Sequence, residues 1–185
     1  MRKNTIMGIV FPNAHDELMG EMTEKRSMGS LPFCGRYRHI DFSLSNLVNA
    51  GISKVGVVTK NNYQSLMDHI GSGKAWDLDR KSGGLFFLPP YSNTEARVYV
   101  GHLDGLFGAM DFLKNSTEQY VVLCDSDVIS NFDLSDMIEK HIDSKADITI
   151  AYKRGKMPCN HHDVMSFTLD GDKITDISFA SADKE

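Results

Sequence analysis

The stretch that decides the fold is Asp41-Phe-Ser-Leu-Ser-Asn-Leu-Val-Asn-Ala-Gly-Ile-Ser-Lys-Val-Gly-Val-Val-Thr59. Its first part, Asp41–Asn49, places its apolar residues close to one face of a helix, and Gly51 follows as a plausible C-terminal cap. Its second part, Lys54–Thr59, is short, β-branched and largely apolar, as is typical of a strand buried on both faces. A helix followed directly by such a strand is a repeating unit of an α/β sheet.

The same alternation continues along the rest of the chain. Short apolar runs predict strands, and amphipathic stretches between them predict helices. The other expected strands are Thr5–Phe11, Gly84–Leu88, Tyr120–Cys124 and Asp147–Tyr152. The other expected helices are Tyr63–Ile70, Leu103–Leu113 and Ser135–Asp143, and a hairpin is expected from Met165–Leu169 and Ile174–Phe179 around Gly171. The predicted fold class is therefore α/β, with a Rossmann-like, mostly parallel sheet in a three-layer α/β/α arrangement.

Composition narrows the possible partners. The 185 residues are 41% hydrophobic and 24% charged, which fits one globular domain. The formal charge of -5 offers no basic field for a nucleic acid, so none is expected as a partner. No run approaches the roughly 20 apolar residues that span a bilayer, so no membrane association is expected. The three cysteines lack CxxC spacing, which favours reduced thiols and a cytoplasmic location.

The longest segment without a predicted element, Pro12–Gly35, directly follows the first strand. Open α/β sheets bind their ligands at the carboxyl ends of the strands. A functional site is therefore expected around this segment.

Two consecutive segments point to a family. Leu31-Pro-Phe-Cys-Gly-Arg-Tyr-Arg-His-Ile-Asp-Phe-Ser-Leu-Ser-Asn46 and Asn49-Ala-Gly-Ile-Ser-Lys-Val-Gly56 closely resemble the glucose-1-phosphate adenylyltransferase (ADP-glucose pyrophosphorylase) family. Further matches, in order, are His69-Ile-Gly with Trp76-Asp-Leu-Asp79, Leu88-Pro-Pro90, Tyr99-Val-Gly-His-Leu-Asp104 and Val122-Leu-Cys-Asp-Ser-Asp-Val-Ile129. The resemblance implies a sheet of the nucleotidyltransferase, GT-A-like type. It also implies that residues 1–185 are the N-terminal part of that domain, with its remainder, the second metal-binding acid and a C-terminal β-helix domain lying beyond Glu185.

The loop after the first strand departs from the family pattern. Active members resemble Gly-Gly-x-Gly-x-Arg-Leu there, followed by Arg-Ala-Lys-Pro, whereas this chain reads Phe11-Pro-Asn-Ala-His-Asp-Glu-Leu18 and has Met28 in place of the family lysine. Binding a triphosphate requires converging backbone N–H groups, and in-line attack requires nearby cations. At a separation of about 5 Å and an effective dielectric of about 20, the repulsion between a phosphate charge and the carboxylate of Asp16 would be about 3 kcal/mol, and the same holds for Glu17. We therefore assign no catalytic residue.

This pattern resembles the GlgD-type, non-catalytic subunits of the family. The resemblance implies a regulatory subunit that modulates ADP-glucose formation from ATP and glucose 1-phosphate for glycogen synthesis. Its implied partner is a catalytic glucose-1-phosphate adenylyltransferase subunit, with weak binding of nucleotide or sugar phosphate. Two alternatives stay open: a divergent active enzyme in which Lys25, Arg26 or Arg36 replaces the lost cations, and a ligand-free module for oligomer contacts.

Four residues are site candidates by position in the family pattern. Gly101, His102 and Asp104 match a nucleotide-binding segment, and we interpret them as vestigial nucleotide contacts. His102 is bulkier than the family residue, Gly101 would serve a tight turn, and Asp104 could equally cap a helix. Asp127 matches the aspartate that holds Mg²⁺, although a carboxylate at a strand end could also cap the next element.

Other polar groups have simpler structural interpretations. Local pairing of Arg38 with Asp41 is favoured over a catalytic role. Trp76 is expected to pack rather than to stack on a ligand. Asp125-Ser-Asp127 also fits the short DxD pattern of metal-dependent glycosyltransferases, which the longer matches outweigh. Cys159-Asn-His-His162 contains zinc-binding residue types but has no second pair at zinc spacing.

Overall fold

The structure is a computed structural model that describes residues 5–89, 99, 101–131, 133–155 and 165–179. The run Cys159–His162, for which a zinc site is not favoured, lies outside these residues. The chain divides into two compact units, Met1–Lys145 and Ala146–Glu185, and each is described by itself.

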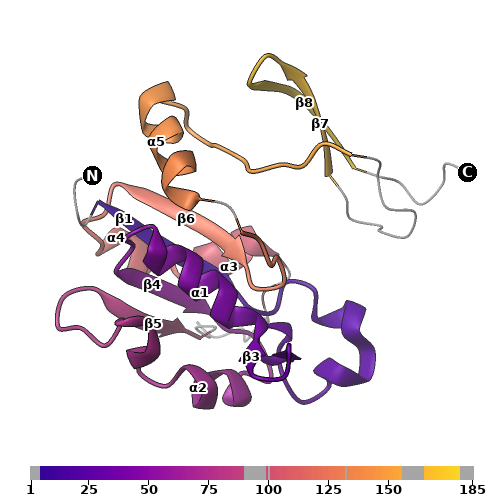
Figure 1. Ribbon diagram of the computed structural model, residues 1–185, viewed down its shortest axis with the longest axis vertical. Coiled ribbons are helices and arrows are strands. Elements are labelled where there is room, and N and C mark those ends of the chain that lie inside the picture. Colours follow the sequence, from indigo (N-terminus) through magenta and orange to yellow (C-terminus); the bar gives the residue numbers. More distant parts are fainter. Residues whose placement is uncertain (1–4, 90–98, 100, 132, 156–164, 180–185) are drawn as a thin grey trace, which may run out of the picture. The chain divides into compact units, whose positions relative to one another are not determined.

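Four parallel strands form the sheet of the first unit (Figure 1). They are β1 (Ile6–Phe11), β4 (Lys54–Val58), β5 (Gly84–Leu88) and β6 (Tyr120–Asp125), in the order β5-β4-β1-β6. All four strands were expected from the sequence, and each observed end lies within one residue of the expected one. The strands are all parallel, and β1 lies between β4 and β6 in the sheet. This strand order confirms the Rossmann-like class.

Helices cover both faces of this sheet and complete the three layers. Figure 1 shows α1 across one face, with α3 and α4 behind the strands. The α-helices are α1 (His39–Asn49), α2 (Gln64–Ile70), α3 (His102–Gly108), α4 (Met110–Lys114) and α5 (Leu134–Ser144). Short 3₁₀ segments and two two-residue strands complete the unit: η1 (Asp16–Thr23), η2 (Met28–Ser30), η3 (Lys74–Trp76), β2 (Pro32–Phe33) and β3 (Tyr37–Arg38).

The core consists of two apolar clusters, one on each face of the sheet. The first unites β1 and β4 with α1, α2 and α5 through buried residues such as Val10, Leu44, Leu47, Val57, Leu66 and Ile138. The second unites Ile9, Phe11, Val58, Leu88, Tyr99 and Ala109, with α4 packed against it. The approach of α1 to β1 is close, since a Cβ added to Gly8 would lie 2.8 Å from a methyl carbon of Leu47.

Burial on both faces holds for β1 and β4 but not for β6. The side chains of β6 alternate between half-buried and exposed, with Val121 42% and Leu123 50% exposed. The sequence predicted a fully buried strand from the same apolar run. Within the described residues β6 is an edge strand of the sheet, and neither apolar cluster covers the face that carries Val121 and Leu123.

Two expected elements differ in the structure. The single helix expected over Leu103–Leu113 is divided at Ala109 into α3 and α4. Gly108 has little room there, because an added Cβ would lie 2.2 Å from the Tyr99 hydroxyl oxygen, and glycine also weakens helices.

The strand expected over Asp147–Tyr152 does not form. It contains the β-branched run Ile148-Thr149-Ile150, but Ile148 is 78% exposed and Tyr152 is 47% exposed. A strand depends on a neighbouring ladder more than on its own propensity, so the pattern alone was not sufficient.

The second unit contains the expected hairpin. Strands β7 (Met165–Asp170) and β8 (Lys173–Phe179) pair antiparallel, with Asp170 opposite Lys173. Gly171 in the turn has φ 62°, a conformation that glycine adopts without strain. In the parts of the chain that the structure describes, every helix is too short or too polar to cross a bilayer.

The packing of α1 on β1 gives a first prediction. Leu47 is 1% exposed in the first cluster, so Leu47→Ala should lower the free energy of unfolding by about 2–5 kcal/mol. Leu103 is 83% exposed, so Leu103→Ala should change it by no more than about 0.5 kcal/mol. Urea denaturation of both variants measures the difference, and equal losses would contradict the described core.

A second prediction concerns the cysteines. Desolvation raises the pKa of the Cys124 thiol to about 12, because its side chain packs against the first cluster. Cys34 is exposed. At pH 8 a thiol reagent should therefore modify Cys34 in the folded protein and Cys124 only after unfolding, as peptide mapping by mass spectrometry can determine. Equal labelling rates for the two residues would refute the predicted burial.

Candidate functional site

The register of β1 with β6 positions the candidate site. Phe11, the last residue of β1, lies opposite Asp125, the last residue of β6. The Ser126 amide donates a hydrogen bond to the Phe11 carbonyl at 3.2 Å, which extends this pairing by one step. The segments that follow the two strands therefore emerge side by side at the carboxyl edge of the sheet, where η1 also lies (Figure 1).

Asp127, the expected metal ligand, contacts a residue that the sequence did not single out. Its Oδ2 accepts a hydrogen bond from His15 Nδ1, and the two side chains are 15% and 34% exposed. Its Oδ1 is buried and has no hydrogen-bond partner among the described residues. The alternative role as a helix cap belongs instead to Asp133, whose Oδ1 accepts the Ser135 amide at 2.8 Å and begins α5.

The residues around Asp127 do not fit Mg²⁺. This ion requires six oxygen ligands at about 2.0–2.1 Å in near-octahedral geometry. Asp127 Oδ2 contacts the His15 imidazole, and Asp127 Oδ1 is buried. Within the described residues, no group of three His, Cys, Asp or Glu side chains is arranged to hold a metal ion.

His102 makes a parallel contact at the same edge. It is the first residue of α3, and its Nε2 lies 2.6 Å from Asp125 Oδ1. Its ring stands edge-on to Phe11, with the two centroids 4.6 Å apart. The hydrogen bond to Asp125 raises the pKa of His102 above 6.5, assisted by the charges of Asp125 and Asp127 and opposed by burial and Lys60.

The other two candidates begin the same helix. Gly101 precedes α3 in an extended conformation with φ -149°, and no described atom would lie within 4 Å of an added Cβ. Other residues could adopt the same conformation, so the backbone of position 101 does not itself require glycine. Asp104 lies exposed in the first turn of α3, where a carboxylate interacts favourably with the helix dipole.

Comparison with known proteins gives the site its context. The family model described as nucleotidyl transferase matches residues 19–175. The chain belongs to this nucleotidyl transferase family. One relative is a Bacillus subtilis (strain 168) protein named glycogen biosynthesis protein GlgD, which is 38% identical to this chain over 157 residues. The aligned region covers 84% of this chain and 46% of that protein. A glucose-1-phosphate adenylyltransferase of Clostridium kluyveri is 36% identical, over 82% of this chain and 40% of the relative.

A solved structure supports the same fold at lower identity. A Bacillus anthracis protein described as a glucose-1-phosphate thymidylyltransferase superposes with a TM-score of 0.67 at 16% identity, over 94% of this chain and 64% of the other. The expected resemblance to the glucose-1-phosphate adenylyltransferase family and to GlgD is thus confirmed. The chain spans less than half the length of these curated relatives, so statements about the whole protein are proposals.

The loop after β1, which departs from the glycine-rich pattern that the family resemblance implies, is held by hydrogen bonds of its own side chains. Asp16 Oδ1 accepts the Met28 amide at 2.7 Å, and Asp16 Oδ2 accepts the Asn13 side-chain amide at 2.6 Å. Asn13 is 3% exposed and also accepts the Lys60 amide at 3.3 Å, which ties the loop to the end of β4. The sequence interpretation treated Asp16 as a charge opposing phosphate; its carboxylate instead organises the loop.

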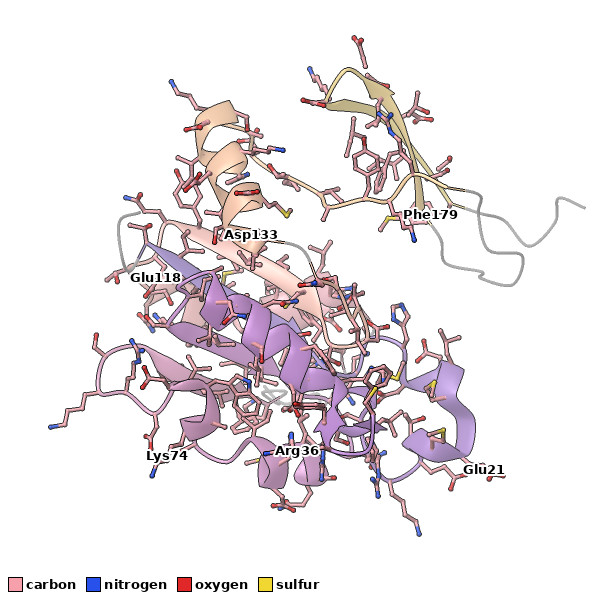
Figure 2. The ribbon with its side chains drawn as sticks, viewed as in Figure 1. Glu21, Arg36, Lys74, Glu118, Asp133 and Phe179 are labelled. Carbon is pink, nitrogen blue, oxygen red and sulfur yellow. The ribbon has the colours of Figure 1, made fainter. Side chains whose placement is uncertain are left out.

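Further hydrogen bonds fix the far end of η1. The Thr23 hydroxyl donates to the Asp16 carbonyl at 2.6 Å, and the Asn62 side chain donates to the Glu24 carbonyl at 2.9 Å. Gly20 bends η1 with φ 52° and ψ -127°, a conformation that favours glycine. Figure 2 shows Glu21 at the outer tip of this segment, at the opposite side of the unit from Glu118.

The three cations considered as replacements lie elsewhere. Lys25 and Arg26 line a shallow pocket together with Glu21, Glu24 and Pro32, and Asp127 does not contribute to it. Arg36 is exposed in the turn between β2 and β3. The loop from Pro12 does not fold away from Asp127, because His15 contacts it.

The segment that matched the family best has the expected structural roles. Asp41 Oδ2 accepts the Arg38 backbone amide at 3.0 Å, so the two residues pair locally, although not through the guanidinium. That group instead donates to the Ser65 carbonyl at 2.6 Å. Asp41 Oδ1 lies 2.6 Å from His69 Nε2. Trp76 packs against the first cluster, as expected for a core residue.

Sequence inspection missed His15 and Asn13 as site residues. Their position in the sequence could have indicated them, because both residues closely follow a strand whose carboxyl end lies at the expected ligand site. A histidine close after β1 and an aspartate close after β6 meet here because these strands are neighbours. That neighbour relation became visible with the sheet order.

The His102–Asp125 pair predicts a pH dependence. Because the folded-state pKa of His102 is raised above 6.5, its protonation stabilises the fold fully below about pH 6.5, and this contribution is lost as the pH rises through the raised value. Asp125→Asn should move the pKa of His102 down, as NMR titration of the imidazole can measure. The melting temperature should then differ between wild type and variant more at pH 6 than at pH 9. An unchanged His102 titration in the variant would refute the pairing.

Proposed function

We propose that the protein to which this chain belongs is a cytoplasmic, non-catalytic regulatory subunit of glucose-1-phosphate adenylyltransferase. It would modulate the formation of ADP-glucose and pyrophosphate from ATP and glucose 1-phosphate in glycogen synthesis. The relatives named for glycogen biosynthesis and for this adenylyltransferase support the pathway. The proposed partner is a catalytic subunit of the same family.

The observation that carries the proposal is the state of the loop after β1. A catalytic loop must present backbone N–H groups and cations to the phosphates. In this chain Pro12 has no N–H, and Asp16 receives the Met28 amide internally. His15 extends from the same loop to Asp127, the residue to which the family resemblance assigns the metal. Nucleotide contacts at Gly101, His102 and Asp104 are on this proposal vestigial and weak.

The enzyme alternative has less support. It requires Lys25, Arg26 or Arg36 to line a cleft beside Asp127, and the first two face a separate pocket with acidic neighbours. Loss of one charge-stabilising donor commonly costs on the order of 100-fold to 1000-fold in rate. Losing the loop glycines, the arginine and the lysine together would leave little turnover.

The deciding experiment measures pyrophosphate release from ATP and glucose 1-phosphate. The full-length protein is assayed alone and then mixed with the catalytic subunit of its organism, with a heat-denatured sample as the control. We expect no turnover alone, and an altered rate or effector response in the mixture. Turnover by the protein alone, at a purity that excludes the catalytic subunit, would overturn the proposal.

The ligand-free alternative calls for a separate measurement. Melting curves recorded with ATP and with glucose 1-phosphate should show a small upward shift if the vestigial contacts still bind, since a ligand specific for the folded state stabilises it. Absence of any shift at millimolar ligand would favour a module that provides only oligomer contacts.

A further inference from the structure

The 3₁₀ segment η1 carries apolar side chains that the folded unit leaves in solvent. Leu18 is 62% exposed and Met22 is 56% exposed, although both belong to one eight-residue segment. Single exposed apolar residues are ordinary, whereas neighbouring ones with polar groups around them are typical of a contact surface. Figure 2 shows Glu21, which lies between the two in the sequence, at the outer tip of this segment.

The backbone of η1 is held in place by hydrogen bonds from buried or anchored side chains. Thr23 is 7% exposed, and its hydroxyl donates to the Asp16 carbonyl at 2.6 Å and to the Gly20 carbonyl at 3.0 Å. The Asn62 side chain, which follows β4, donates to the Glu24 carbonyl at 2.9 Å. A partner that binds this segment would therefore have to order little additional backbone, which favours binding.

A pocket adjoins the exposed segment and offers room for a side chain of a partner. It has a volume of about 450 Å³, and its apolar lining consists of Met22, Leu31 and Pro32. Charged side chains complete the lining, among them Glu21. Leu18, Met22 and this pocket are named the η1 surface below. It has an apolar centre and a charged rim, which is the usual arrangement in protein interfaces.

Charge indicates which kind of partner fits the η1 surface. Residues 16–24 contain four acidic side chains and no basic one, and Lys25 and Arg26 offset only half of this charge. The exposed acids are Glu17, Glu21 and Glu24. A second copy of the chain would bring like charges together, and the chain as a whole has a formal charge of -5. The η1 surface therefore fits a different protein surface, with an apolar protrusion and Lys or Arg side chains around it.

We propose that the η1 surface is a docking site for a basic, partly apolar surface of the catalytic glucose-1-phosphate adenylyltransferase subunit. This inference rests on the proposed regulatory function, because that function supplies the partner. The family resemblance assigns phosphate binding to the segment after the first strand. In this chain the same segment would bind a protein surface instead.

The first test measures the affinity between the full-length protein and the catalytic subunit of its organism by isothermal titration calorimetry. Leu18→Ser and Met22→Ser should each raise the dissociation constant by about tenfold or more, because each removes an apolar anchor. Both side chains are largely exposed, so the melting temperature of the variants should stay that of wild type.

Ile142→Ser is the matched control for these two variants. Ile142 is 39% exposed in the last turn of α5, outside the η1 surface, so its replacement should leave the dissociation constant unchanged. An unchanged dissociation constant in both Leu18→Ser and Met22→Ser would overturn the proposal.

A second test separates the charges from the apolar contacts by measuring the association rate in a stopped-flow instrument. The double variant Glu17→Gln, Glu21→Gln should associate more slowly at low salt, whereas Glu139→Gln, which neutralises an exposed acid of α5, should have a much smaller effect. At about 1 M salt, where the Debye length is about 3 Å, wild type and the double variant should associate equally fast. A double variant that associates as fast as wild type or faster at low salt would contradict a basic partner surface.

Thiol labelling of Leu18→Cys tests for other occupants of the η1 surface. The introduced cysteine should react readily in the full-length protein alone and slowly after the catalytic subunit is added, and peptide mapping separates it from Cys34. Slow labelling of the protein alone at every concentration would mean that another part of the same chain covers η1. Protection that increases with protein concentration would mean that a second copy does. Either result would overturn the proposal.

Failure of the docking proposal can be told apart from failure of the regulatory one. If wild type binds the catalytic subunit and alters its activity while both serine variants at η1 do so equally well, docking lies elsewhere and the regulatory function stands. If wild type neither binds the catalytic subunit nor alters its activity, the regulatory function fails, and the docking proposal fails with it.

Discussion

The parallel pairing of β1 with β6 is the constraint on which the rest of the site depends. Six consecutive residue pairs, from Ile6 opposite Tyr120 to Phe11 opposite Asp125, fix the relative height of the two strands. A shift by one residue would turn every side chain to the other face. Because Val122 and Cys124 of β6 pack against the first cluster, the register is fixed and the two following segments meet at a defined place. His15 and Asp127, which are far apart in the sequence, become neighbours as a result.

The fold could be predicted from the sequence where burial is complete. β1 and β4 are apolar on both faces because clusters cover both of them, and such runs are recognisable without any partner. α1 ends before Gly51, as its cap predicted. The predictions failed where a neighbour decides the outcome. Asp147–Tyr152 has suitable residues for a strand but no neighbouring strand among the described residues. The helix expected over Leu103–Leu113 is divided at Ala109, next to the close approach of Gly108 to Tyr99.

The candidate site was predictable in position but not in chemistry. The carboxyl edge, the altered loop and Asp127 all followed from sequence order and from the family resemblance. What the sequence could not give is the direction of each side chain. Asp16 was interpreted as a charge facing phosphate, whereas it turns inward to the Met28 amide. The departure from the glycine-rich loop was visible from the sequence. The contacts made by the altered loop became visible only in the structure.

The close approach of α1 to β1 has a consequence for how the sequence can change. Position 8 has room only for a hydrogen atom because the Leu47 side chain fills the space above it. The side chains at positions 8 and 47 therefore share one space between the strand and the helix. Among homologues, a larger residue at position 8 should appear together with a smaller one at position 47. Such covariation would show from sequences alone how closely α1 and β1 pack.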